Sequence, residues 1–146
     1  MIKEMTKPIE ILMVEDSLDD VELTRESLKG TKIHYSLSVV EDGVEAMAFL
    51  GKEGKYAVAP RPDLVILDLK LPKKDGHEVL EEIKSDPNLR SIPVVVLTTS
   101  RDDRDVLKAY EHYASCYVSK PLDLNQLLGV AKWLENWLTV VRLPKQ

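Results

Sequence analysis

The chain has 146 residues, a formal net charge of −5 and a single cysteine, Cys116. This length fits one domain with a core large enough to fold without disulfides. The acidic balance and the lack of a basic run argue against a nucleic-acid-binding surface. A lone cysteine excludes an intrachain disulfide and favours a reducing, cytoplasmic location. No apolar run approaches the ~20 residues that span a bilayer, so a membrane is not an expected partner either.

The first part of the chain alternates apolar runs with segments that have helical spacing. Ser17, followed by acidic residues, is typical of a helix start, and Gly30 ends that helix. The interval 51–62 is rich in glycine and proline, which indicates a surface loop. The other elements expected here are strands over 9–14 and 35–40, a turn over 41–43, and a short helix containing Val44, Met47, Ala48 and Leu50.

The apolar run 64–67, which ends on Asp68, predicts a fully buried central strand. It lies between Pro62 and Pro72 and contains β-branched residues, as parallel strands buried on both faces do. Asp68 stands where this strand reaches its carboxyl end, the edge at which ligands bind in open α/β sheets. Taken alone, it could equally be a helix N-cap or a turn former.

The rest of the chain continues the same alternation and completes five β–α repeats. Such a pattern predicts an α/β fold with a parallel sheet, helices on both faces and right-handed connections. The expected elements are a turn over 73–76, a helix with Val79, Leu80 and Ile83 that closes at Asp86, a strand over 94–97, a helix over 101–113, a strand over 115–118 and a final helix from Asp123 to about Val141.

Chemically active side chains follow four of these strands: Glu15 and Asp16, Asp68, Thr98, and Lys120. Each has an ordinary interpretation as a capping acid, a strand threonine or a surface lysine. All strands of a parallel sheet end at one edge, however, so the groups can meet. Crowded carboxylates raise one another's pKa, and a divalent cation such as Mg²⁺ removes that repulsion. With the lysine and the hydroxyl, the set suits phosphoryl transfer to a carboxylate.

Four segments in this order resemble the receiver domain of two-component response regulators: Val-Glu15-Asp16-Ser, Leu-Asp68-Leu-Lys-Leu-Pro, Val-Leu-Thr98-Thr-Ser and Val-Ser-Lys120-Pro. The resemblance implies a flavodoxin-like, doubly wound (βα)₅ domain with its core over about 8–130 and a helical extension over 131–146. It implies that Asp68 is the phosphoacceptor. It further implies Mg²⁺ ligands (Glu15, Asp16, Asp68 and the Lys70 backbone carbonyl), phosphoryl contacts (Thr98 and Lys120) and a switch aromatic (Tyr117).

A finer resemblance links the chain to the small, single-domain response regulators that partner bacterial phytochromes. It rests on the long loop 51–62, on Leu-Pro-Lys-Lys-Asp-Gly after the third strand, and on the ending that begins at Trp137. A phytochrome-type histidine kinase is then the implied phosphodonor. One departure is the pair Glu15-Asp16, which stands where many receivers have two aspartates; glutamate still supplies a carboxylate.

The final helix predicts a surface for a protein partner. One apolar stripe belongs to the core, and a second, with Trp133 and Trp137, is rotated away from it. We expect a homodimer through the fourth helix, the fifth strand and the fifth helix of the fold, with Tyr110, Tyr113, Trp133 and Trp137 at the interface. The alternative is that the tail folds back over both tryptophans.

Two other functions remain open at this stage. A phosphohydrolase with an aspartyl nucleophile would need an acid two residues after Asp68, where Lys70 stands, and a cap insertion. A non-phosphorylated interaction module would usually lack an acid, the threonine or the lysine. We therefore expect a phosphoacceptor rather than a turnover enzyme, with self-catalysed phosphorylation and slow dephosphorylation only. His34, His77 and His112 are expected to face solvent, away from the site.

Overall fold

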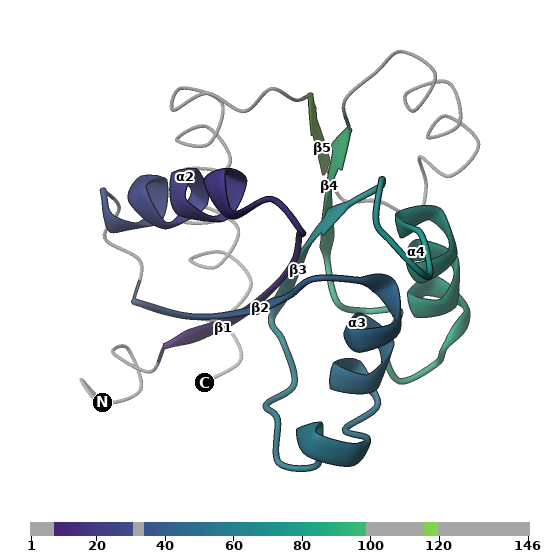
Figure 1. Cartoon of the computed structure of the whole chain (residues 1–146). Helices are drawn as coiled ribbons and strands as arrows, with labels where there is room; N and C mark the ends of the chain where they lie inside the picture. Colours follow the sequence, from purple (N-terminus) through teal and green to yellow (C-terminus); the bar gives the residue numbers. More distant parts are fainter. Residues whose placement is uncertain (1–7, 31–33, 99–115, 120–146) are drawn as a thin grey trace.

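The computed structural model describes residues 8–30, 34–98 and 116–119 (Figure 1). They form a five-stranded parallel sheet in the order β2-β1-β3-β4-β5, which is the flavodoxin-like order. The predicted α/β fold is therefore confirmed, and the helices expected over 101–113 and 123–141 lie outside the described residues. The elements are β1 (Ile9–Val14), α2 (Leu18–Lys29), β2 (Tyr35–Val40), α3 (Gly43–Leu50), a short 3₁₀ helix (Gly54–Tyr56), β3 (Leu64–Asp68), α4 (Gly76–Ser85), β4 (Val94–Thr98) and β5 (Cys116–Ser119).

The sheet separates two hydrophobic layers, because successive side chains of a strand point to opposite faces. On β1, Leu12 and Val14 pack with the layer that contains α3 and α4. Ile11 and Met13 pack with the layer that contains Val21 of α2. Figure 1 shows α2 on one side of the sheet and α3 and α4 on the other. The sheet is thus covered by helices on both faces, as the strand sequences predict.

Strand β3 is central, and all five of its residues are buried. Its neighbours are β1 and β4, with Leu67 level with Val14 and Asp68 level with Leu97. The chain leaves β1 for β2 on one side, and then crosses to β3 on the other side of β1. This reversal creates a topological switch point at the carboxyl ends of β1 and β3, where open α/β sheets bind ligands.

Each of the described α-helices begins at a polar side chain that accepts a hydrogen bond from the first turn, as N-caps do. The Ser17 hydroxyl accepts from the Asp20 N–H at 3.3 Å. The carboxylates of Asp42 and Asp75 do the same for α3 and α4, at 2.8 and 3.1 Å. The caps fix where α2, α3 and α4 start.

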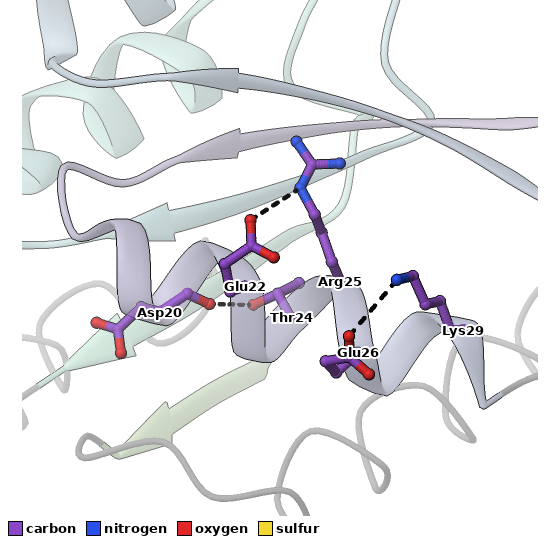
Figure 2. Close-up of polar contacts among 6 residues, drawn as sticks. All are labelled: Asp20, Glu22, Thr24, Arg25, Glu26 and Lys29. Carbon is purple, nitrogen blue, oxygen red and sulfur yellow. Dashed lines mark hydrogen bonds and ion pairs between the residues drawn. The ribbon is translucent and has the colours of Figure 1, made fainter.

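The outer face of α2 carries charged pairs at helical spacing (Figure 2). Arg25 lies 3.8 Å from Glu22, and Lys29 lies 3.5 Å from Glu26. Thr24 is buried, and its hydroxyl donates to the Asp20 carbonyl at 3.0 Å. The side chains of these pairs are exposed, so this face of α2 is the solvated one, as expected. Exposed ion pairs of this kind contribute little to stability. Among the described helices, none combines the length and the apolar composition needed to cross a membrane.

The short helix predicted after the turn over 41–43 is present as α3, and one detail, the burial of His77, differs from the sequence prediction. The buried stripe of α3 is formed by Ala46, Phe49 and Leu50, whereas Val44 is 48% exposed. Spacing of three and four residues brings the first three to one face, and Val44 lies outside that stripe. His77 is half-buried rather than solvent-facing, because it precedes the buried Leu80 by three residues and borders the core face of α4. His34 is exposed, as predicted, and His112 lies outside the described residues.

The long loop 51–62 is anchored to α3 at its middle. The Tyr56 hydroxyl donates to Glu45 at 2.7 Å, and the Lys55 ammonium lies 3.0 Å from the same carboxylate. The rings of Phe49 and Tyr56 are 5.3 Å apart. The loop is otherwise largely exposed, with Val58 at 94%, which confirms the predicted surface loop.

Candidate functional site

Three carboxylates meet at the switch point. Glu15 and Asp16 follow β1, and Asp68 is the last residue of β3. One oxygen from each side chain lies within 4.8 Å of the other two. Glu15 and Asp68 are 1% and 3% exposed, whereas Asp16 is exposed. The predicted convergence of these acids is therefore present in the fold.

Backbone hydrogen bonds orient the two buried acids. Glu15 donates its own N–H to the Val40 carbonyl at 2.9 Å, and one of its carboxylate oxygens accepts from the Ser17 N–H at 3.1 Å. Asp68 Oδ1 accepts from the Lys70 N–H at 3.1 Å. These bonds hold the two side chains in place.

The chemistry of this donor set fits a divalent metal ion. Burying a carboxylate costs free energy unless it is paired or coordinates a metal, and two of the three acids are buried. Carboxylate oxygens are hard ligands of the kind that Mg²⁺, Mn²⁺ and Ca²⁺ prefer. Because the third acid, Asp16, is exposed, the cluster opens to solvent on its side. The residues present can thus hold a divalent cation.

The loop 69–75 connects β3 to α4 and lies directly after the acid Asp68. Leu69 donates to the Leu97 carbonyl at 3.2 Å and accepts from the Gly76 N–H at 2.9 Å. A Cβ built on Gly76 would overlap the backbone oxygen of Asp68, so only glycine allows α4 to start this close to the acid. Lys70 is exposed at the beginning of this loop.

The structure describes the other predicted site residues only in part. Thr98 is the last residue of β4 and stands level with Ser119, one position beyond the pair Asp68 and Leu97. Tyr117 lies in β5, level with Val96. Their backbones reach the expected strands, while Lys120, Tyr110, Tyr113, Trp133 and Trp137 lie outside the described residues.

The sequence interpretation missed a contact between two turns beside the site. Asp42, 7% exposed, lies with one carboxylate oxygen 3.5 Å from the Lys73 ammonium. Gly43, the next residue, lies against the backbone of Lys74. An aspartate three residues before Glu45 does signal a helix N-cap. Its pairing with Lys73 leaves no signal in the sequence, because the two turns meet only in the tertiary structure.

Comparison with known proteins gives a consistent result. The family pattern of the response regulator receiver domain matches residues 11–132. Response regulator Rcp1 of Synechocystis sp. is 48% identical over 145 residues, covering 99% of each chain. The crystal structure of the phosphorylated cyanobacterial phytochrome response regulator RcpA has a TM-score of 0.79 and 47% identity, covering 92% of this chain and 96% of that one. The Mn²⁺-bound form of Rcp1 has a TM-score of 0.79 and 49% identity, covering 92% and 97%.

These matches extend over far more than half of the chain and agree with the sheet order and the acidic cluster. Receiver domains are signalling domains rather than a classical enzyme family; they typically accept a phosphoryl group, typically have a histidine kinase as partner, and bind a divalent metal at an acidic site. The chain therefore belongs to the response regulator receiver domain family and is related to the phytochrome response regulators.

Proposed function

We propose that this response regulator is a phosphoryl-accepting switch and that Asp68 is its acceptor. The observation that carries the proposal is the position of Asp68, at the end of the central strand and within 4.8 Å of the Glu15 and Asp16 carboxylates. Asp63 precedes the same strand, and its carboxylate accepts from the Glu10 N–H at 2.9 Å, away from this cluster. The position of Asp68 in the acidic cluster therefore supports it, rather than Asp63, as the acceptor.

In the proposed reaction, an oxygen of the Asp68 carboxylate attacks the phosphorus of a phosphohistidine. The new oxygen–phosphorus bond forms as the nitrogen–phosphorus bond breaks, which leaves an acyl phosphate on Asp68 and returns the histidine to the kinase. The Lys70 N–H orients the acceptor through Asp68 Oδ1. Thr98 and Lys120 contact the transferred phosphoryl group, whose negative charge a hydroxyl and an ammonium stabilise. The domain also catalyses its own phosphorylation and slow dephosphorylation.

Glu15, Asp16, Asp68 and the backbone carbonyl of Lys70 are the proposed ligands of Mg²⁺. A cation held by these residues would supply positive charge that offsets the negative charge of the phosphoryl oxygens beside the acceptor. The buried, closely spaced acids support this assignment, and the structure of the relative Rcp1 is a Mn²⁺-bound form. Glutamate at position 15 supplies the same ligand atom as the aspartate of many receivers.

The proposed donor is a phytochrome-type histidine kinase, because RcpA is a phytochrome response regulator and is 47% identical to this chain. We place the reaction in the reducing cytoplasm, which suits a chain with one cysteine. The receiver core spans about 8–130 and is followed by the helical extension 131–146. The output is protein contact, through a homodimer that uses Tyr110, Tyr113, Trp133 and Trp137, with Tyr117 coupling it to phosphorylation.

A phosphotransfer assay tests the acceptor and the donor together. A phytochrome-type kinase carrying labelled phosphohistidine is mixed with the parent, with Asp68→Asn and with Asp63→Asn, in Mg²⁺ or in chelator. Asp63→Asn is the matched control, because it makes the same substitution at the other end of β3 and keeps an acceptor oxygen for the Glu10 N–H. Label is expected to reach the parent and the control only in Mg²⁺. If Asp68→Asn is labelled as strongly as the parent, Asp68 is not the acceptor. If an unrelated kinase transfers the label equally fast, the proposal of a phytochrome-type donor is contradicted.

Sedimentation velocity tests the dimer. The double substitution Trp133→Ala and Trp137→Ala is expected to shift the parent from dimer towards monomer, because large aromatic side chains dominate such interfaces. An unchanged dimer would place the interface elsewhere. A parent that stays monomeric with and without a phosphoryl mimic would remove the homodimer from the proposal.

A further inference from the structure

The loop 69–75 is held by the turn that precedes α3. Lys73 places its ammonium 3.5 Å from Asp42, whose side chain is 10% exposed, whereas the Lys73 side chain is 67% exposed. The other carboxylate oxygen of Asp42 accepts from the Glu45 N–H at 2.8 Å. One nearly buried carboxylate therefore joins the start of α3 to the loop beside the acceptor.

The backbones of the two turns are also in close contact. A Cβ built on Gly43 would overlap the carbonyl of Lys74, so the loop touches the turn at a place where no side chain fits. Lys73 has a φ of 66°, in the left-handed region that residues other than glycine rarely adopt. Such conformations persist when the surrounding contacts determine them, and they concentrate at functional sites.

The same loop contacts the acceptor directly. Its first part supplies the Lys70 N–H that Asp68 Oδ1 accepts at 3.1 Å. At its base, Gly76 donates to the Leu69 carbonyl at 2.9 Å and packs against the Asp68 backbone. A shift of the loop at Lys73 would therefore be transmitted to the Lys70 main chain and to the Asp68 carboxylate.

We propose that Asp42 and Lys73 are positioning residues that set the metal affinity of the site. They hold the loop 69–75 in the conformation that presents the main chain of Lys70 to the three carboxylates. The inference rests on the proposed function, in which those carboxylates and Lys70 hold a divalent cation. Neither residue contacts the metal; each acts through the loop.

Metal affinity measured by Mn²⁺ electron paramagnetic resonance, with Mg²⁺ as competitor, tests the proposal. Asp42→Asn keeps the helix cap and removes the charge, and Lys73→Gln removes the other partner. Both variants are expected to bind Mn²⁺ about tenfold more weakly than the parent. This is the lower end of the loss in metal affinity seen when a residue that orients a metal ligand is replaced. Lys73→Arg keeps the cation and is expected to bind as the parent does. Lys55→Gln is the matched control, because it breaks an ion pair to α3 that lies away from the loop.

Lys73→Gln separates positioning from simple charge effects. Removal of a cation near the site removes a Coulomb repulsion and would by itself strengthen Mn²⁺ binding, so weaker binding reports a change of position. Tighter or unchanged binding in Lys73→Gln overturns the proposal. An equal loss in Lys55→Gln also overturns it, because the effect would then not depend on the loop.

Hydrogen exchange of the metal-free protein supplies a second measurement. The amides of residues 69–71 and 73–75 are expected to exchange faster in Asp42→Asn and Lys73→Gln than in the parent, and at the parental rate in Lys55→Gln. Unchanged exchange in all three variants would contradict the proposal. A parent that binds no Mn²⁺ overturns the proposed function with it, whereas a binding parent with unaffected variants overturns only the positioning role.

Discussion

Asp63 and Asp68 flank the same buried strand, yet only Asp68 lies among other carboxylates. Asp63 accepts a backbone hydrogen bond from Glu10, which gives it a structural task at the amino end of β3. Asp68 lies at the carboxyl end, beside Glu15 and Asp16. The same side chain thus has a different chemistry at each end of one strand, because the direction of the strand decides what surrounds it.

Substitution of Gly76 tests how closely the acceptor is packed. Gly76→Ala is expected to lower the free energy of unfolding by about 1–3 kcal/mol, as overpacking does, and to weaken Mn²⁺ binding because the new Cβ pushes on Asp68. Gly54→Ala is the contrast: its φ is +56° and it has open space around it, so it costs about 1–2 kcal/mol through backbone strain alone. Urea unfolding and Mn²⁺ titration check both. Parental Mn²⁺ affinity in Gly76→Ala would contradict this role.

The contact between Glu45 and Tyr56 is expected to make stability depend on pH. The Tyr56 hydroxyl and the Lys55 ammonium lower the pKa of Glu45 below 4.5. A lowered folded-state pKa stabilises the protein above 4.5, and this contribution is lost as the pH falls through the lowered value. Tyr56→Phe moves the pKa back towards 4.5, so its stability deficit is expected to shrink as the pH falls below 4.5.

Urea unfolding of Tyr56→Phe and the parent, above and well below pH 4.5, measures this change. Tyr35→Phe on β2 is the control, because it loses the same hydroxyl on a different element. A deficit of Tyr56→Phe that stays constant across this range would show that the hydrogen bond does not perturb Glu45.

At the scale of elements, the strands were predictable from the sequence. Strands β1, β2 and β3 span the predicted residues. The apolar run of β3 is what a central strand covered on both faces requires, whereas β2 lies at the edge of the sheet and also contains two serines. Helix α2 also matches, since Ser17 and Gly30 mark its two ends. Helix α3 was predicted as well, but eight residues contain too few turns to define from the sequence which of its apolar side chains face the core.

The core face of α4 gives a direct test at this scale. Ile83 is fully buried against the sheet, so Ile83→Ala is expected to cost about 2–5 kcal/mol of unfolding free energy through lost contacts and the cavity left behind. Val58→Ala, at a side chain 94% exposed, is the control and is expected to change stability by less than about 0.5 kcal/mol. Equal costs in urea unfolding would contradict the layered core.

At the scale of the whole molecule, topology explains why the acids meet. Glu15 and Asp68 are far apart in sequence, but parallel strands end at one edge, and β1 and β3 are neighbours at the switch point. The sequence could therefore predict this convergence. It could not predict that Lys73 pairs with Asp42, because that contact depends on how two loops pack above the sheet.

Intact-mass spectrometry after incubation with acetyl phosphate tests the central claim most directly, since no kinase has to be identified. The parent and Asp63→Asn are expected to gain the mass of one phosphoryl group in Mg²⁺ and none in chelator, while Asp68→Asn gains none in either. A Mg²⁺-dependent gain in Asp68→Asn equal to that of the parent would contradict Asp68 as the acceptor, and a gain that persists in chelator would contradict the metal site.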